Sequence, residues 1–258
     1  MKERTAAAEP EGRPRRDRNL LVPAIFSLLG IATLCGLGFW QVERKAWKEG
    51  LTAAIHERVG AAPTEFPPAR AWGDLSPEKD EYRHVWLEGR FLNDKEAHLQ
   101  TNLVSSGPDD GELGYDMLTP FEMADGSLVI VNRGFVPLVK KDPSTRAQGQ
   151  IEGETRLTGL IRFPQSRRWF TPNDDPARNV WFSRDPAPIA KAHGLARVAP
   201  VIVDADADKA ARISDPAPRG GQTRIELRND HLQYALTWFG LAIVLAGTFG
   251  AYALKRQS

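Results

Sequence analysis

Two long apolar runs without charge constrain this chain more than any other feature. Residues 20–40 and 232–254 contain 21 and 23 residues, with no Asp, Glu, Lys or Arg among them. At about 1.5 Å per residue, a helix of the shorter run spans roughly 31 Å, the thickness of the hydrocarbon core of a bilayer. We therefore predict a transmembrane helix at 20–40 and a second one at 232–254.

The first run does not have the features of a cleaved or lipid-modified signal. It is longer than the apolar region of a signal peptide, about 7–15 residues, and no A-x-A cleavage site follows it. Leu34 stands before Cys35, where a lipoprotein signal needs a small residue. Asp17-Arg18 follow Arg15-Arg16, where a twin-arginine signal needs apolar residues. An uncharged helix of this length is also unusual as a soluble core helix.

Basic residues flank the outer ends of both spans and set the expected orientation. Residues 1–19 hold six basic and four acidic side chains, and Lys255-Arg256 follow the second span. The positive-inside rule then predicts cytoplasmic tails at 1–19 and 255–258, with residues 41–231 extracytoplasmic. The first 19 residues are too acidic for a mitochondrial transit peptide, so we expect a bacterial cytoplasmic (inner) membrane with the main domain in the periplasm.

The exported segment, residues 41–231, has the size of one domain. Residues 41–59 repeat apolar side chains at helical spacing, and 61–77 are rich in Pro and Ala, which is typical of a linker. Short runs with β-type patterning follow, separated by turn residues such as Asp125-Gly126. We predict strands at 83–92, 97–104, 114–121, 128–137, 155–163, 180–183, 199–203 and 224–227, and a minor helix at 188–193. The expected fold is a mainly-β extracytoplasmic domain, an antiparallel sandwich or barrel, bracketed by two transmembrane α-helices.

Composition and motifs exclude several classes of function. The formal net charge of +1 gives no field that would attract nucleic acid, and a single cysteine excludes an intramolecular disulfide. The sequence contains no P-loop, no G-x-G-x-x-G after a strand, no H-E-x-x-H and no G-x-S-x-G. We therefore expect a protein that is not an enzyme and whose evident partner is the lipid bilayer.

Candidate chemistry gathers where the two spans meet the outer membrane surface. His231, Tyr234 and Trp238 are spaced three to seven residues apart at the start of the second span, and Arg44 follows the first span. An imidazole here can ligate haem iron, and an arginine can pair with a propionate. The alternative is an interfacial histidine among ordinary aromatic anchors. Small residues repeat every four positions at Ala32/Gly36 and Ala242/Ala246/Gly250, which favours close helix packing.

An ordered set of segments resembles the surfeit locus protein 1 family of cytochrome c oxidase assembly factors. The segments are GFWQVERKAWK (38–48), GYDMLTP (114–120), VIVNRGFVP (129–137), GLIR (159–162), WFSRD (181–185) and RNDHLQYALTWF (228–239). The resemblance implies two spans, an exported β-rich domain, and a role with oxidase subunit I and the haem a synthesis machinery. It also implies haem a as a transient cofactor, and among the site residues it carries over only His231, as the candidate iron ligand. Arg44, Trp238 and Tyr234 are weaker candidates for cofactor contact, on the ground of their place near the outer membrane surface.

Two alternatives stay open at this point. The first is a cofactor-free membrane chaperone that stabilises subunit I, and the second is a membrane-anchored hydrolase with a divergent site. Arg133 and Arg228 are weaker candidates for the site. For Arg133, the expected role is to fix a turn by pairing with a carboxylate.

Overall fold

The computed structural model describes residues 20–104, 111–165, 167, 169–207, 218–221, 223 and 229–257. The chain divides into two compact units. Residues 1–50 and 227–258 form one, which we call the helical unit, and residues 51–226 form the other, which we call the barrel unit.

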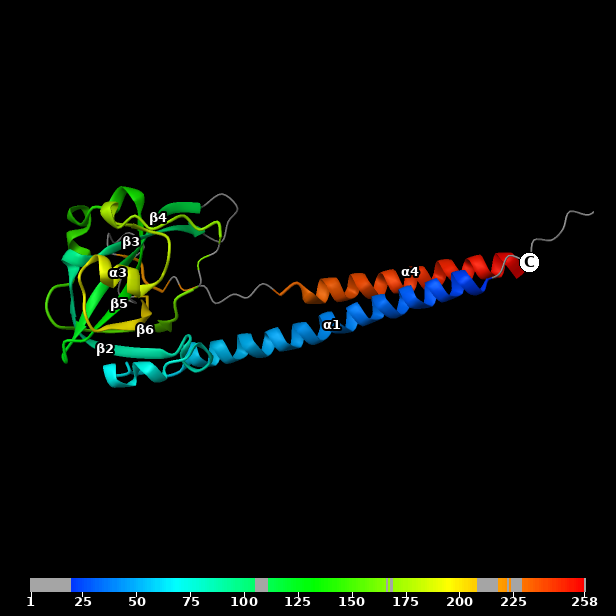
Figure 1. Ribbon diagram of the computed structural model, residues 1–258, viewed down its shortest axis with the longest axis horizontal. Coiled ribbons are helices and arrows are strands. Elements are labelled where there is room, and N and C mark those ends of the chain that lie inside the picture. The colour runs from blue at the N-terminus through cyan, green and yellow to red at the C-terminus, as the bar shows by residue number, and fades with distance from the viewer. Residues whose placement is uncertain are drawn as a thin grey trace, which may run out of the picture. The chain divides into compact units, whose positions relative to one another are not determined.

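Two long helices carry the apolar runs (Figure 1). The first, α1, is Leu21–Gly60, and the second, α4, is His231–Gln257. Both are long and apolar enough to cross a membrane, as the sequence predicts. Pro23 lies in the first turn of α1, where its missing N–H costs no helical hydrogen bond. Residues 41–59 are helical, as predicted, because they belong to α1. At about 1.5 Å per residue, the 40 residues of α1 are longer than a bilayer is thick.

The barrel unit is built from strands joined by turns and short helices. In chain order they are β1 (Thr64–Glu65), η1 (Ala69–Asp74), α2 (Pro77–Asp80), β2 (His84–Phe91), η2 (Asn93–Lys95), β3 (Ala97–Val104), β4 (Gly111–Met123), β5 (Leu128–Pro137), η3 (Leu138–Lys140), η4 (Pro143–Gly149), β6 (Thr155–Arg162), η5 (Pro176–Arg178), β7 (Val180–Trp181), α3 (Pro186–Ala192) and β8 (Val198–Ala205). Seven of the eight predicted strands are present; the eighth, at 224–227, lies outside the described residues.

Five strands close into a barrel in the order β2-β6-β8-β5-β4, because β4 pairs again with β2. Strand β2 pairs with β6 along its first six residues and with β4 along its last three, so Gly89 takes part in both pairings. A Cβ atom at Gly89 would collide with the carbonyl oxygen of Glu122, so only glycine allows the backbones to approach this closely. The predicted β-domain is thus a closed barrel.

Alternation along the barrel strands separates an inner and an outer apolar layer. The inner layer fills the barrel and includes Val85, Leu87, Phe121, Val129, Val131, Ile161, Val201 and Val203. The outer layer packs α3 and β7 against the barrel and includes Leu99, Leu118, Ile130, Trp181, Ile189 and Ile202. Because successive side chains of a strand point to opposite faces, Val129 and Val131 lie inside while Ile130 lies outside.

The structure differs from the sequence prediction in two details of the barrel unit. The pairs β5–β8, β1–β2 and β3–β7 are parallel, where antiparallel strands were expected. In each pair a long stretch of chain separates the two strands, so no hairpin imposes an antiparallel direction. The expected linker at 61–77 is also structured, because Phe66 and Trp72 pack against the inner core and Trp72 Nε1 donates to the carbonyl of Pro67 at 2.9 Å.

Candidate functional site

The two helices of the helical unit pack antiparallel through small residues. Gly30 lies against Leu245, and Gly38 lies against the ring of Phe239. Ala235 and Ala242 are the buried apolar residues of α4. Phe39 and Phe239 meet edge to face, with ring centroids 5.4 Å apart. These contacts fix which residues of α1 and α4 lie at the same level.

The predicted small-residue faces are used only in part. Ala242 is buried, but Ala32, Gly36 and Ala246 are exposed, and a Cβ atom at Gly36 would meet open space. The α1 residues that do contact α4 include Gly30 and Gly38. Spacing alone could not tell this pair from the predicted pair Ala32 and Gly36, because both pairs are spaced so that they share one face of a helix.

His231 and Gln41 form the polar contact of this helix pair. His231 is the first residue of α4, and its Nδ1 lies 2.7 Å from Gln41 Oε1. Gln41 is buried, so its amide oxygen has little access to water. An amide oxygen can only accept a hydrogen bond, so His231 Nδ1 carries the proton and donates it. In the neutral imidazole the lone pair is then on Nε2, the atom that would bind a metal.

The other predicted site residues lie around this pair at different exposures. Trp238 is half-buried two turns farther along α4. Arg44 is exposed, and its guanidinium stacks over Trp47 at 3.9 Å from the ring centroid. The structure brings His231 and Trp238 to the same face of α4, together with Ala235, whereas Tyr234 is 55% exposed on another side.

Two buried polar atoms of the helical unit have no hydrogen-bond partner among the described residues. They are Asn229 Oδ1, just before α4, and the indole Nε1 of Trp238. A buried donor or acceptor without a partner costs about 1–3 kcal/mol. These two atoms are therefore unsatisfied polar groups in a mainly apolar helix pair.

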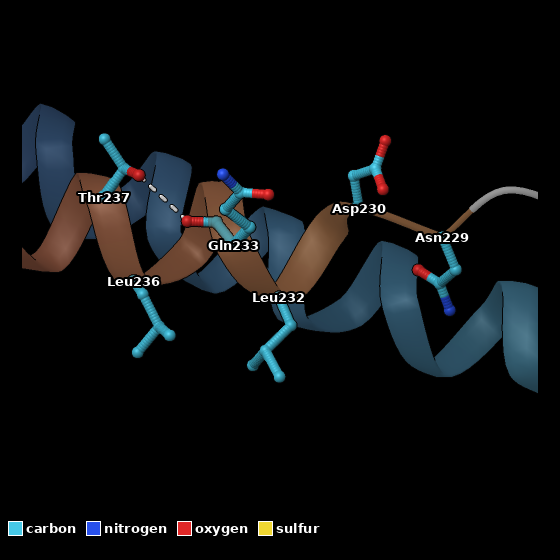
Figure 2. Close-up of a pocket in the computed structure, with 6 residues that line it drawn as sticks. All are labelled: Asn229, Asp230, Leu232, Gln233, Leu236 and Thr237. Atoms are coloured by element: carbon cyan, nitrogen blue, oxygen red, sulfur yellow. Dashed lines mark hydrogen bonds between the residues drawn. The ribbon is translucent and has the colours of Figure 1, made fainter. Parts of the chain in front are cut away.

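An open groove of about 580 Å³ follows the first two turns of α4 (Figure 2). Leu232 and Leu236 point to the same side of the helix, and Thr237 Oγ1 donates to the carbonyl of Gln233 at 2.9 Å. The described residues that line the groove do not include His231. The groove has a mixed polar and apolar lining and is separate from the histidine–glutamine contact.

The donor set at His231 suits some metal groups and not others. Among the described residues, no three His, Cys, Asp or Glu side chains lie close enough to hold a metal ion. A haem differs from a bare ion because its porphyrin supplies four nitrogen ligands, and one imidazole then suffices to attach it. The imidazole of His231, fixed through Nδ1 with Nε2 available, fits a haem better than any bare metal ion.

Sequence reasoning found His231 but missed Gln41. The signal was present: Gln41 follows Trp40 directly at the end of the first apolar run, and His231 stands directly before the second run. Two antiparallel spans bring such end residues to the same depth. Arg133 does bond to the end of a turn, but the carboxylate partner expected for it is wrong. Its guanidinium, in the barrel unit, donates to Asn93 Oδ1 at 3.2 Å and to the carbonyl of Gly149, and has no carboxylate partner among the described residues. Arg228 lies outside the described residues.

Comparison with known proteins agrees with this architecture. The model of the SURF1 family matches residues 28–243. Surfeit locus protein 1 of Mus musculus is 40% identical over 226 residues, which cover 84% of this chain and 71% of the mouse protein. Its counterpart in Homo sapiens is 36% identical over 252 residues, covering 92% and 79%. The SURF1-like protein of Drosophila melanogaster is 40% identical over 256 residues, covering 93% and 81%.

The match begins inside the first apolar helix and ends inside the second, so it includes part of each helix and the whole barrel between them. Two apolar helices that could cross a membrane, a closed β-barrel between them, and this extent of identity lead to one conclusion: the chain belongs to the SURF1 family of membrane-associated cytochrome c oxidase assembly factors.

Proposed function

We propose that this assembly factor holds haem a while oxidase subunit I matures, with His231 as the ligand of the iron. The observation that carries the proposal is the 2.7 Å contact from His231 Nδ1 to the buried Gln41. A histidine that binds a metal through one ring nitrogen usually donates a hydrogen bond from the other ring N–H to an oxygen. This bond sets the tautomer and the orientation of the ring. Gln41 provides that oxygen here.

The surroundings of His231 suit an amphipathic macrocycle. Haem joins a wide apolar ring to charged propionates, so it needs an apolar surface next to a cation. Both helices continue into their apolar runs from this contact, and their aromatic rings meet there. The ring centroid of Phe39, two residues before Gln41, lies 5.4 Å from that of Phe239, which is about two turns beyond His231 on α4. Arg44 is three residues beyond Gln41 on α1, about 4.5 Å along the helix axis, where it can pair with a propionate. Trp238 and Tyr234 are weaker candidates for contact with the ring.

When bound, the haem supplies the redox-active iron that subunit I needs, and the residues of this chain only hold and orient it. His231 holds the iron, Gln41 orients His231, and Arg44 pairs with a propionate. None of these side chains needs to transfer a proton or form a covalent bond, which agrees with an assembly factor that is not an enzyme.

We propose a bacterial cytoplasmic membrane as the location, with both tails in the cytoplasm and the barrel unit in the periplasm. The basic residues before the first span and Lys255-Arg256 after the second support this orientation. In this arrangement the proposed partners are oxidase subunit I and the haem a synthesis machinery in the same bilayer. A reporter that is active only after export, fused after Ser258, should be silent; activity would contradict the orientation.

An absorption spectrum of the purified full chain tests the haem proposal. The protein is produced in a host that makes haem a and is then purified in mild detergent. We expect a copurified haem band in the wild type and its loss in His231→Ala. His56→Ala is the matched control, because His56 is an exposed histidine of α1 far from Gln41 in sequence. The control should keep the band.

The amount of inserted protein and its haem content together distinguish a haem-holding factor from a cofactor-free chaperone. His231→Ala should insert and accumulate normally, since the residue lies at the end of α4 and is only half-buried. Unchanged haem content in a stable variant would eliminate His231 as a ligand. A wild type without haem that still raises the level of subunit I would favour the cofactor-free chaperone.

A further inference from the structure

Arg133 is a cation inside the barrel. It lies on β5 two residues after Val131 and four after Val129, so it shares their inward face, and only 7% of its surface is exposed. Its guanidinium stacks on Phe91, an inward residue of β2, at 4.5 Å from the ring centroid. An arginine therefore occupies a position that valine fills elsewhere on the same strand face.

The other buried arginines of the barrel unit each have a carboxylate partner. Arg146 bonds to Glu96, and Arg162 donates to Asp204 at 3.0 Å. Arg133 instead donates to a side-chain amide oxygen and a backbone carbonyl, both neutral. Among the described residues it is thus a buried charge without an opposite charge in contact, a costly arrangement.

The charge of Arg133 persists at neutral pH. Burial lowers the pKa of its guanidinium to about 10; the carboxylate of Glu96 acts against this, and the charge of Arg146 adds to it. A pKa near 10 still leaves the group almost fully protonated at pH 7. The positive charge inside the barrel therefore remains available to an anion.

A cavity of about 800 Å³ opens at Arg133. Its lining is mixed: Phe91, Ile151 and Leu157 form an apolar part, and polar side chains, with Arg156 among them, form the rest. The one carboxylate among its described lining residues is Asp206, whose Oδ2 lies 2.7 Å from His84 Nε2 and also accepts from Thr158 Oγ1. That carboxylate is already paired, so it does not neutralise Arg133.

We propose that this cavity, which we call the barrel-mouth cavity, binds the carboxylate of an amphipathic molecule. The carboxylate pairs with Arg133, and the apolar part lies against Phe91, Ile151 and Leu157. A carboxylate fits because a guanidinium binds it with charge-assisted hydrogen bonds, and the apolar part of the lining favours an anion that carries an apolar body over a small hydrated one. The site lies wholly in the barrel unit and does not depend on the haem proposal for His231.

Photolabelling of the full chain in lipid nanodiscs tests this inference. The probe is a decanoic acid that carries a diazirine, and its matched control is the corresponding neutral amide. We expect the acid to label the peptides that contain Phe91 and residues 148–158, and the amide to label them about tenfold less, since a charge-assisted hydrogen bond adds roughly 1.5–3 kcal/mol. Equal labelling by acid and amide, or labelling only elsewhere, would overturn the proposal.

Substitutions test whether the charge of Arg133 is the one that binds the carboxylate of the probe. Arg133→Met should lower labelling by the acid about tenfold. Arg90→Gln is the control, because Arg90 lies next to Phe91 on β2 but is exposed and paired with Glu122 at 2.8 Å. A folded Arg133→Met protein that is labelled like the wild type would contradict the site.

A second pair of variants covers the case in which Arg133→Met fails to fold. Ile151 is 43% exposed at the cavity, so polar substitutions there should not disturb the barrel. Ile151→Asp adds a negative charge and should reduce labelling, whereas Ile151→Asn, equal in size, should not. Equal labelling of the two would count against an anion site.

Competition then identifies the source of the carboxylate. Metal-free protoporphyrin and laurate share the required chemistry, a carboxylate on an apolar body. Displacement of the probe by the porphyrin but not by its dimethyl ester would assign a porphyrin propionate. Displacement by laurate alone would assign a fatty acid. Failure of both to displace the probe would overturn the proposal.

Discussion

The barrel unit and the helical unit bury polar side chains by different means. In the barrel unit two of the three buried arginines among the described residues, Arg146 and Arg162, meet carboxylates, and Arg133 is the exception. In the helical unit the buried polar contact is between an imidazole and an amide, His231 and Gln41, groups that need carry no charge. Charges are costly in hydrocarbon, whereas a barrel bordered by water can bury them in pairs. The same chain therefore uses ion pairs in one unit and a dipolar hydrogen bond in the other.

The largest effect should come from breaking an ion pair of the barrel. Glu96→Gln leaves Arg146, whose side chain is fully buried, without its carboxylate. We expect the free energy of unfolding to fall by about 3–5 kcal/mol, because an unpaired charge then stays buried. Pulse proteolysis in urea, on the full chain in nanodiscs, measures this loss.

An exposed ion pair supplies the control. Arg178 and Asp175 lie 4.0 Å apart, and the Arg178 side chain is 81% exposed, so Arg178→Gln should change stability by less than about 1 kcal/mol. If Glu96→Gln lowered the unfolding free energy as little as Arg178→Gln, the stability of the barrel unit would not depend on its buried ion pairs. Replacing both partners, Glu96→Gln with Arg146→Met, should recover part of the loss.

A pair of glycines compares how tightly each unit is packed. A Cβ atom at Gly89 would strike the backbone carbonyl of Glu122, which the barrel holds in place. A Cβ atom at Gly38 would meet only the ring of Phe239, 2.6 Å away, and a ring can turn aside. We expect Gly89→Ala to cost about 2–3 kcal/mol and Gly38→Ala less than about 1 kcal/mol, by the same proteolysis assay. A reversed order would contradict closure of the barrel at Gly89.

Local patterns explain why much of the fold was predictable from the sequence. Absence of charge predicts the two long helices, and period-two alternation predicts the strands that have an inner and an outer face, such as β5. The linker prediction failed because Pro and Ala dominate residues 61–77, while Phe66 and Trp72, the side chains that anchor it, are few. Closure at Gly89 was not predictable, since it depends on strands far apart in the chain.

The polar sites show the same limit. His231 stands out at the edge of an apolar run, but its partner Gln41 is 190 residues away, and the helix register alone brings them together. Arg133 could have been placed inside the barrel, because it continues the inward positions of Val129 and Val131. Its lack of a carboxylate partner appears only when Asn93 and Gly149 are placed beside it.

Acid should lower the unfolding free energy of the barrel unit by protonating Glu96. We expect this loss to be smaller than the loss from Glu96→Gln or from Gly89→Ala. Burial alone would raise the pKa of this carboxyl, but hydrogen bonds from His98 and Arg146 outweigh burial and hold the pKa below its ordinary 4.5. A folded-state pKa below the unfolded one gives a stabilisation that is complete above pH 4.5 and is lost as the pH falls through the folded value. Unfolding free energies of wild type and Glu96→Gln should therefore converge in acid; a constant difference would contradict the lowered pKa.

The smallest effect should come from the dipolar contact of the helical unit. Gln41→Met keeps the length of the side chain and removes the acceptor of His231 Nδ1. Hydrogen bonds between membrane helices contribute about 0.6 kcal/mol on average, because polar groups separated in a membrane find other partners. Spin labels on Cys35, the one cysteine of the chain, and on Ile243→Cys, an exposed position of α4, report separation of the helices as SDS is added. The midpoint should move slightly to lower SDS for Gln41→Met and stay unchanged for Gln233→Met, an exposed glutamine of α4. A loss as large as that of Glu96→Gln would mean that the helical unit depends on its polar contact as strongly as the barrel depends on its ion pairs, and the contrast between the two units would fail.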